Sequence, residues 1–186
     1  MGRIAIGCLL LFGALCSVSL AVTPVRGKYS NGRLGYEVTL PAGLVCMKSE
    51  PDQGCGFNTA LRFAESEWKA DAPPARYMWV SGEMNTGDEN TMERAVQKAV
   101  TVNTASRAGA IVLGRKYKML GGLPAAEIDI SYSAEESEAL EKLVVIYRER
   151  KGAPNVIYTF GLHTPRGNED DDVRLFHEFV SGFRVK

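Results

Sequence analysis

Two carboxylates two positions apart are the side chains whose type and spacing most directly suggest chemistry. Glu127 and Asp129 alternate with apolar residues, so a strand at this place would present both carboxylates on one face. With His163 as a base they could transfer protons in a hydrolase, provided that the three groups face one pocket. Neighbouring acidic residues more often occupy the solvated face of a sheet, so the hydrolase is the third of three functional hypotheses.

Other catalytic and metal-binding sequence patterns are absent. The chain contains neither Gly-x-Ser-x-Gly nor His-Glu-x-x-His, and no glycine-rich loop with a phosphate-binding lysine. The acidic run 169–172 places carboxylates at adjacent positions, whereas a calcium loop spaces them at alternate positions. The second of the two histidines, His177, is expected on a helix surface. We therefore expect a protein without catalytic residues, cofactor or metal, and not an enzyme.

The balance of charge limits the classes of partner. The 186 residues include 22 basic and 22 acidic side chains, and 45% of the residues are hydrophobic. A neutral globular chain has no field that steers it to nucleic acid or to an anionic membrane. We expect no nucleic-acid partner.

The N-terminus has the three parts of a secretory signal peptide. Arg3 supplies the positive region, residues 4–15 are apolar, and Ser19-Leu20-Ala21 is a small-x-small cleavage site. Residues 1–21 are therefore expected to be removed, leaving a protein of the bacterial periplasm or exterior without stable membrane insertion. An uncleaved anchor is the alternative, because the uncharged stretch nearly reaches the length of a bilayer span.

Cysteine usage agrees with export. Cys8 and Cys16 lie inside the signal peptide, which leaves Cys46 and Cys55 on either side of a short loop rich in Pro, Asp, Gln and Gly. Two cysteines in an oxidising compartment tend to pair, so we predict a structural disulfide. A redox pair or a metal site would more typically show Cys-x-x-Cys or additional ligands.

Apolar and polar residues alternate along most of the expected strands. The run 143–147 is apolar at every position, which is typical of an interior strand covered on both faces. Prolines 73 and 74 exclude regular structure between residues 65 and 75, and residues 81–89 are expected as a polar loop. The other strands are expected at 35–40, 44–47, about 57–64, 76–81, 111–120 with a bulge at Gly114, 126–132 and 156–162.

Two amphipathic helices are expected. The first, 90–108, has Asn90 at its cap with Glu93 three residues later, and Gly109 at its end. The second follows the cap candidate Asn168, carries carboxylates in its first turn where the helix dipole favours them, and ends at Gly182. Short connections between the strands indicate antiparallel pairing, and two amphipathic helices need a sheet to cover. We therefore predict an α+β domain at 35–186, after a leader at 22–34.

Several local sequences resemble the Mog1/PsbP-like family. They are the strand and turn at 35–41, the Gly-Gly-Leu-Pro-Ala turn at 121–125, Tyr158-Thr159-Phe160, and the segment 175–184 at the end of the chain. The resemblance implies an antiparallel sheet covered by helices, an α/β/α sandwich. In that family the fold serves chiefly as a non-catalytic binding or assembly module.

These observations lead to an exported, non-catalytic protein-binding or accessory module as the first functional hypothesis. The second hypothesis is an inhibitor or immunity protein that neutralises a secreted enzyme. In both cases the partner is another protein, and Trp68, in a Pro-rich polar segment, is the candidate contact residue.

Overall fold

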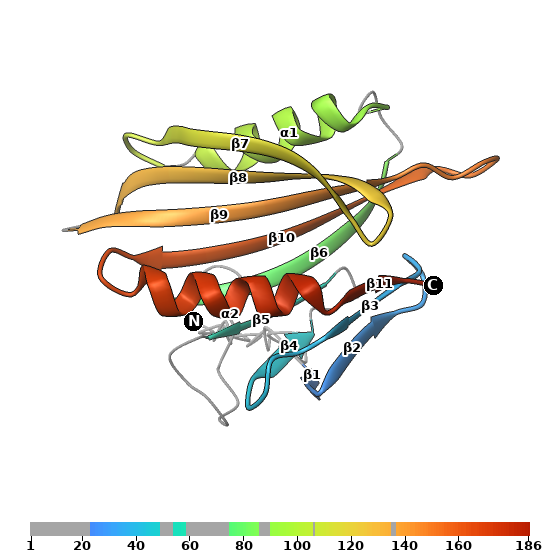
Figure 1. Cartoon of the computed structure of the whole chain (residues 1–186), viewed down its shortest axis with the longest axis horizontal. Helices are drawn as coiled ribbons and strands as arrows, with labels where there is room; N and C mark the ends of the chain where they lie inside the picture. The colour runs from blue at the N-terminus through green and yellow to red at the C-terminus, as the bar shows by residue number, and fades with distance from the viewer. Residues whose placement is uncertain (1–22, 49–53, 59–74, 86–89, 106, 135–136) are drawn as a thin grey trace, which may run out of the picture.

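The computed structural model describes residues 23–48, 54–58, 75–85, 90–105, 107–134 and 137–186 (Figure 1). The expected signal peptide, residues 59–64 of one expected strand, most of the Pro-rich segment and Trp68 lie outside these ranges. The elements are β1 Thr23–Arg26, β2 Lys28–Asn31, β3 Tyr36–Thr39, β4 Val45–Lys48, β5 Gly54–Asn58, β6 Tyr77–Asn85, α1 Met92–Thr104, β7 Ile111–Leu120, β8 Leu123–Ala134, β9 Ser137–Arg148, β10 Asn155–Pro165, α2 Glu169–Ser181 and β11 Phe183–Val185.

The described strands form two antiparallel sheets. The larger has eight strands in the order β1-β4-β5-β6-β10-β9-β8-β7, and the smaller has three in the order β11-β3-β2. Hairpins join β7 to β8, β8 to β9 and β9 to β10, so this half of the large sheet follows chain order. Short antiparallel connections of this kind are those that the sequence predicted.

Two hydrophobic cores lie on opposite faces of the large sheet. On one face α1 covers β8 and β9, and its buried residues Met92, Ala95, Val96 and Val100 contact the core. On the other face α2 and the small sheet pack over β10, β6 and part of β9, and Phe176, Phe179 and Phe183 fill the space. Figure 1 shows α2 across the front of the sheet. The predicted α+β class, with a sheet between helical layers, is confirmed.

Strand β9 lies in the middle of this arrangement. Residues 143–147 are all buried, with Val144 and Ile146 in the α2 core and Leu143, Val145 and Tyr147 in the α1 core. The prediction of a strand covered on both faces is correct, because alternate residues of β9 point to opposite faces of the sheet and each face is covered by a different helix.

The segment 22–34 corrects an expectation. We expected a leader before the domain, but β1 pairs with β4 and β2 pairs with β3. Tyr29 and Asn31 are buried, and the Asn31 Oδ1 accepts a hydrogen bond of 2.9 Å from the Leu34 backbone N–H. A polar residue that anchors a turn does not show in a hydrophobic pattern, which is why the strand was missed.

Loop and cap predictions also need correction. Strand β6 continues to Asn85, so residues 81–85 are not a loop. The cap of α1 is Thr91 rather than Asn90, since the Thr91 side chain accepts from the Arg94 backbone N–H at 3.3 Å. Asn168 precedes α2 but makes no side-chain capping bond. The bulge is confirmed: the β7–β8 register shifts between Val112 and Gly114.

The Cys46–Cys55 disulfide is present and joins β4 to β5. Both cysteines are buried in the core under α2, and their Cα atoms lie 5.6 Å apart. A buried bond between neighbouring strands serves as a local staple, in line with the structural role predicted from the sequence.

Candidate protein-binding surface

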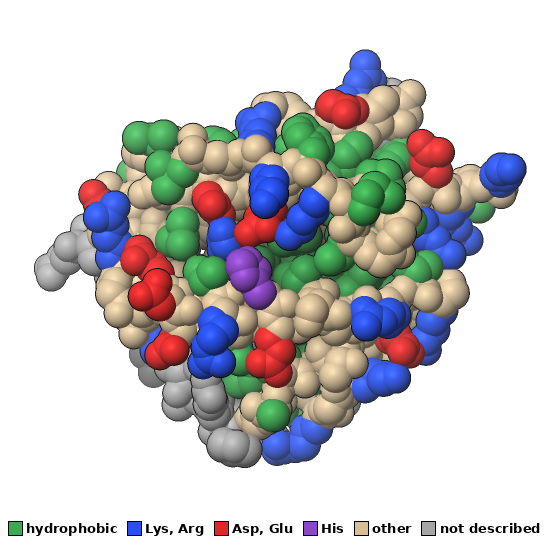
Figure 2. Space-filling model, viewed as in Figure 1, with side chains coloured by type: hydrophobic (Ala, Val, Ile, Leu, Met, Phe, Trp, Pro, Cys, Tyr) green, Lys and Arg blue, Asp and Glu red, His purple; other side chains and the backbone are tan. Residues whose placement is uncertain are grey.

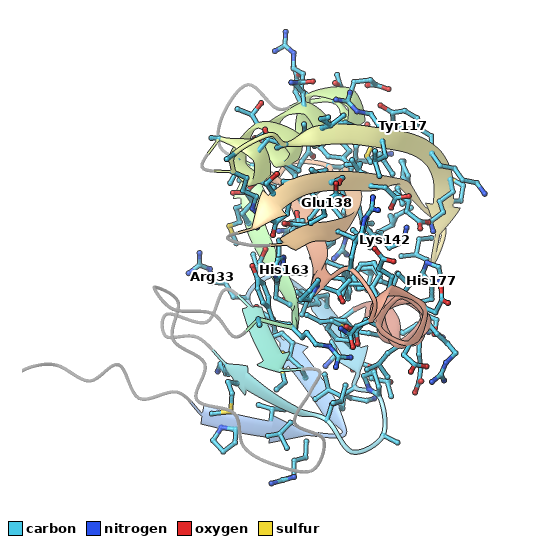
Figure 3. All side chains as sticks on the ribbon, turned by 90° about the vertical axis from the view of Figure 1, so that its left-hand side faces the viewer. Arg33, Tyr117, Glu138, Lys142, His163 and His177 are labelled. Atoms are coloured by element: carbon cyan, nitrogen blue, oxygen red, sulfur yellow. A yellow bond between two sulfur atoms is a disulfide. The ribbon has the colours of Figure 1, made fainter. Side chains whose placement is uncertain are left out.

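The three residues of the hydrolase hypothesis lie on different faces of the sheet. Glu127 and Asp129 alternate with core residues of the α1 face and therefore project to the α2 face. His163 is opposite Tyr77 and Glu141 in the ladder, on the α1 face. Figure 3 shows Lys142 and His177 beside α2, on the other side of the sheet from His163. The proposed acid–base set is therefore wrong, because the sheet itself separates its members.

Glu127 instead belongs to a charge network under α2. Its carboxylate accepts hydrogen bonds from Lys118 Nζ at 2.7 Å and faces Lys142 Nζ at 3.1 Å. Lys142 also pairs with Asp129, and the exposed His177 Nε2 lies 3.3 Å from Glu127 Oε1. A carboxylate already engaged by two ammonium groups is suited to fixing β7, β8 and β9 together and not to proton transfer.

The network makes stability depend on pH. Burial alone would raise the pKa of Glu127, but the hydrogen bonds and charges of Lys118 and Lys142 outweigh it and lower the pKa from 4.5 to about 2. A depressed pKa stabilises the fold above pH 4.5, and this contribution is lost as the pH falls toward 2. We expect Glu127→Gln to lower the free energy of unfolding by roughly 1 to 2 kcal/mol at pH 7. Near pH 2 it should have little effect.

Urea unfolding at pH 7 and at pH 2 measures this difference. Glu178→Gln is the matched control, since Glu178 is an exposed residue of α2. An effect of Glu127→Gln that is the same at both pH values would contradict the ion-pair account.

His163 lies in a second polar cluster, on the α1 face. Its Nδ1 bonds the Tyr132 hydroxyl, and its ring lies against those of Tyr77 and Tyr132. The Arg107 guanidinium sits 4.5 Å above the Tyr132 ring and pairs with the fully buried Glu141. Burial, assisted by the charge of Arg107, lowers the pKa of His163 to about 4. The imidazole is therefore neutral at pH 7 and packs, half-buried, against the Tyr77 and Tyr132 rings.

Four of the five exposed large hydrophobic residues in the described part of the chain lie on β7, and the fifth, Val102, lies on α1. Strand β7 is the last of the eight-stranded sheet, and the side chains of Ile111, Leu113, Tyr117 and Met119 are 52–64% exposed. Figure 2 shows green apolar side chains gathered along this edge, with blue lysine and arginine side chains between them. We call these four residues the β7 surface. Exposed apolar residues concentrated on one strand of a folded domain make that strand a candidate interaction site.

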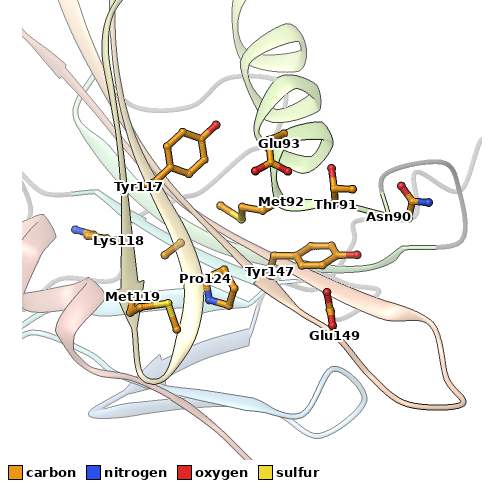
Figure 4. A pocket seen from close by; sticks show the side chains of 11 residues that line it. Asn90, Thr91, Met92, Glu93, Tyr117, Lys118, Met119, Pro124, Tyr147 and Glu149 are labelled. Carbon is orange, nitrogen blue, oxygen red and sulfur yellow. The ribbon is translucent and has the colours of Figure 1, made fainter.

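A shallow pocket adjoins the C-terminal half of β7. It has a volume of about 590 Å³ and lies between the first turn of α1, the β7–β8 hairpin and the end of β9. Figure 4 shows Tyr117 pointing toward the first turn of α1, where Glu93 lies, with Met92 between them. Tyr147 forms part of the floor, and Glu149 stands at the opposite rim from Glu93. Apolar side chains with a few polar groups at the rim are typical of a recognition site.

The β7 surface was not among the predicted sites. Its sequence signal was available: residues 111–120 carry apolar side chains and three cations without one carboxylate. What the sequence did not show is that this strand forms an edge. Trp68, the contact residue that we did predict, lies outside the described residues.

Comparison with solved structures identifies the fold. The chain superimposes on the cyanobacterial PsbP protein CyanoP of Synechocystis sp. PCC 6803 with a TM-score of 0.55 and 17% identity, over 94% of this chain and 99% of that one. It superimposes on the Ran-binding protein Mog1p of Saccharomyces cerevisiae with a TM-score of 0.54 and 16% identity, over 90% and 96%. The fold is Mog1/PsbP-like. This confirms the resemblance seen in the sequence.

Other comparisons agree with the Mog1/PsbP-like fold. LpqN of Mycobacterium tuberculosis, involved in cell envelope biogenesis, matches with a TM-score of 0.56 and 14% identity, over 90% of this chain and 92% of that one. This chain also matches a longer protein from Bacteroides thetaiotaomicron, of which it covers 48% of the length. No protein-family model matches the sequence, and a sequence search of curated proteins finds no relative. At these identities the likeness shows the fold alone.

Two further properties describe the Mog1/PsbP-like domain. Neither helix in the described part of the chain has the length and apolar content that a bilayer span requires. Among the same residues, no three His, Cys, Asp or Glu side chains gather as ligands for a metal ion.

Proposed function

We propose that this protein is an exported accessory module that binds another protein through the β7 surface and the adjoining pocket. The observation that carries the proposal is the concentration of exposed Ile111, Leu113, Tyr117 and Met119 on one edge of the sheet. Tyr and Met are enriched in protein interfaces because they bury much area and adapt to a partner. Burying these side chains would remove from water an apolar surface that the isolated chain leaves exposed.

The charged groups of the domain support binding over catalysis. Glu127 is held by two lysines, and Asp172 is hydrogen-bonded to Arg76 and Thr164. His163 is packed between two tyrosine rings. Glu127, Asp172 and His163 are therefore committed to holding the fold, and none of the three lines the pocket next to β7, whose carboxylates are Glu93 and Glu149.

The similar structures support the same use of the fold. Mog1p is described as a Ran-binding protein, and LpqN as involved in cell envelope biogenesis. The expected signal peptide at 1–21 and the Cys46–Cys55 disulfide support action in an oxidising compartment, the periplasm or the exterior.

Site-specific photo-crosslinking tests the proposal. A p-benzoylphenylalanine side chain at Tyr117 or Met119, in the full chain expressed in its own organism, should link the protein to a defined partner on irradiation. The matched controls place the same group at Arg33, in the turn between β2 and β3, or at Arg166, in the turn between β10 and α2; both residues are exposed. Equal capture at all four positions, or none at Tyr117 and Met119, would overturn the proposal.

The captured partner also separates two forms of this function. If it is a secreted enzyme whose activity falls on binding, the module is an inhibitor or immunity protein. If it is a component of a larger envelope assembly, the module is an accessory subunit.

A further inference from the structure

We propose that the partner presents an extended segment with alternating acidic and apolar residues, which adds to β7 as a ninth strand. The inference rests on the proposed function and specifies how the β7 surface is used. Addition of a peptide strand to an open sheet edge is a recurrent mode of recognition, in which the backbone supplies affinity and alternate side chains supply specificity.

The first observation is the open edge. Strand β7 pairs with β8 on one side, and it is the terminal strand of the sheet on the other. Its ten residues make it long for an edge strand, and the other terminal strand, β1, has four. About half of the backbone N–H and C=O groups of such a strand point away from its neighbour. A partner strand would satisfy them.

The second observation is that the two faces of β7 differ in chemistry between Lys116 and Met119, whereas Arg115, opposite Ile128, adds a cation to the α1 side. Tyr117 and Met119 are opposite Ala126 and Pro124 and lie on the α1 side, at the rim of the pocket. Lys116 and Lys118 are opposite Glu127 and Ala125 and lie on the α2 side. Successive side chains of an added strand would also alternate between these sides. Apolar residues would therefore meet Tyr117 and Met119, while acidic residues would meet the lysines.

The third observation is unneutralised positive charge along the edge. The strand carries Arg115, Lys116 and Lys118 and no acidic residue. Lys118 is engaged by Glu127, whereas Arg115 and Lys116 are exposed and form no ion pair with any described residue. Opposite charges across a strand pair stabilise it, and like charges destabilise it.

The same charges argue against a second copy of this chain as the added strand. An antiparallel pair of β7 strands would bring cations against cations, since β7 itself carries no carboxylate. Edge lysines and a bulge are features by which natural sheets prevent self-association. Together they leave the edge selective for a strand of opposite charge.

Peptide binding to the protein purified from expression of the full chain tests the inference. The probe is a fluorescein-labelled, end-blocked octapeptide in which valine or tyrosine alternates with glutamate, and binding is followed by fluorescence anisotropy. There are three reference peptides. The first carries lysine in place of glutamate, the second has the same residues with all glutamates at one end, and the third has N-methyl groups on two adjacent central amides. The alternating acidic peptide should bind, and all three references should bind more weakly.

Charge reversal locates the contact. Lys116→Glu should weaken binding of the acidic peptide by roughly three- to tenfold, as expected for an exposed ion pair turned into a repulsion, and should favour the lysine peptide. Arg33→Glu also replaces a cation by a carboxylate, in the exposed turn between β2 and β3 of the small sheet, and should leave both affinities unchanged. Thermal melts of both variants exclude unfolding as the cause.

Several results would overturn the inference. Equal binding of the alternating and the segregated acidic peptides would show charge attraction without strand pairing. Equal binding of the N-methylated peptide would exclude backbone pairing. If the alternating acidic peptide did not bind at all, strand addition would also be excluded. If the crosslink at Tyr117 still captures a partner in that case, the proposed function stands and only strand addition fails.

Discussion

Replacing Asp172 by alanine is expected to lower the free energy of unfolding by roughly 3 kcal/mol, the lower end of the range for removing one partner of a buried ion pair, because the Arg76 side chain is 27% exposed. The Asp172 side chain is 2% exposed and accepts from Arg76 Nε at 2.9 Å and Arg76 Nη2 at 2.6 Å. The Thr164 hydroxyl donates to it at 2.8 Å. Loss of the carboxylate leaves a guanidinium and a hydroxyl without their acceptor beneath α2. In a thermal melt, Tm should fall by about 10 °C.

Asp171→Ala is the matched control for this change. Asp171 is the preceding residue of the same helical turn, is 83% exposed, and pairs only loosely with Arg174 at 3.6 Å. Its loss should change stability by less than about 0.5 kcal/mol. If both variants have the same Tm, the bonds of Asp172 to Arg76 and to Thr164 of β10 do not hold α2 on the sheet.

The sequence predicted the strands whose burial follows a simple pattern. Residues 126–132 alternate because one side meets α1 and the other meets the charge network under α2. Residues 143–147 are apolar throughout because both faces are covered. Strand β2 was missed because Asn31, a buried polar residue, interrupts the alternation. The alternation of apolar and polar residues predicts which side chains are buried only where the buried ones are apolar. It does not reveal the hydrogen bond that allows a polar side chain to be buried.

The candidate site was harder to predict, for a physical reason. The strand 111–120 was expected with its bulge, but its place in the sheet is set by long-range pairing that a local pattern does not contain. The failed acid–base set has the same origin. Glu127 and His163 are each on a strand as expected, yet strand register, and not strand content, puts them on opposite faces. The residue types therefore suggested candidate site residues, and the order and register of the strands decided which of these residues lie close together.

Replacing Phe160 by alanine is the second large expected effect, roughly 3 to 5 kcal/mol of lost stability. Phe160 is fully buried on β10, and its ring contacts Phe179 of α2 at 5.1 Å and Phe183 of β11 at 5.7 Å between centroids. Alanine would leave a cavity where α2, the small sheet and the large sheet meet. Phe160→Leu keeps most of the volume and should cost less than about 1.5 kcal/mol. Urea unfolding of both variants beside the unchanged protein measures the two losses.

This variant also separates stability from recognition. Two strands, β9 and β8, lie between β10 and β7, so the Phe160 cavity does not reach the β7 surface. Below its lowered Tm, the Phe160→Ala protein should therefore still crosslink through Tyr117 and bind the acidic peptide with unchanged affinity. Loss of binding while the protein is folded would show that the α2 side of the domain controls the β7 edge, and that the surface is not the independent site that its exposure indicates.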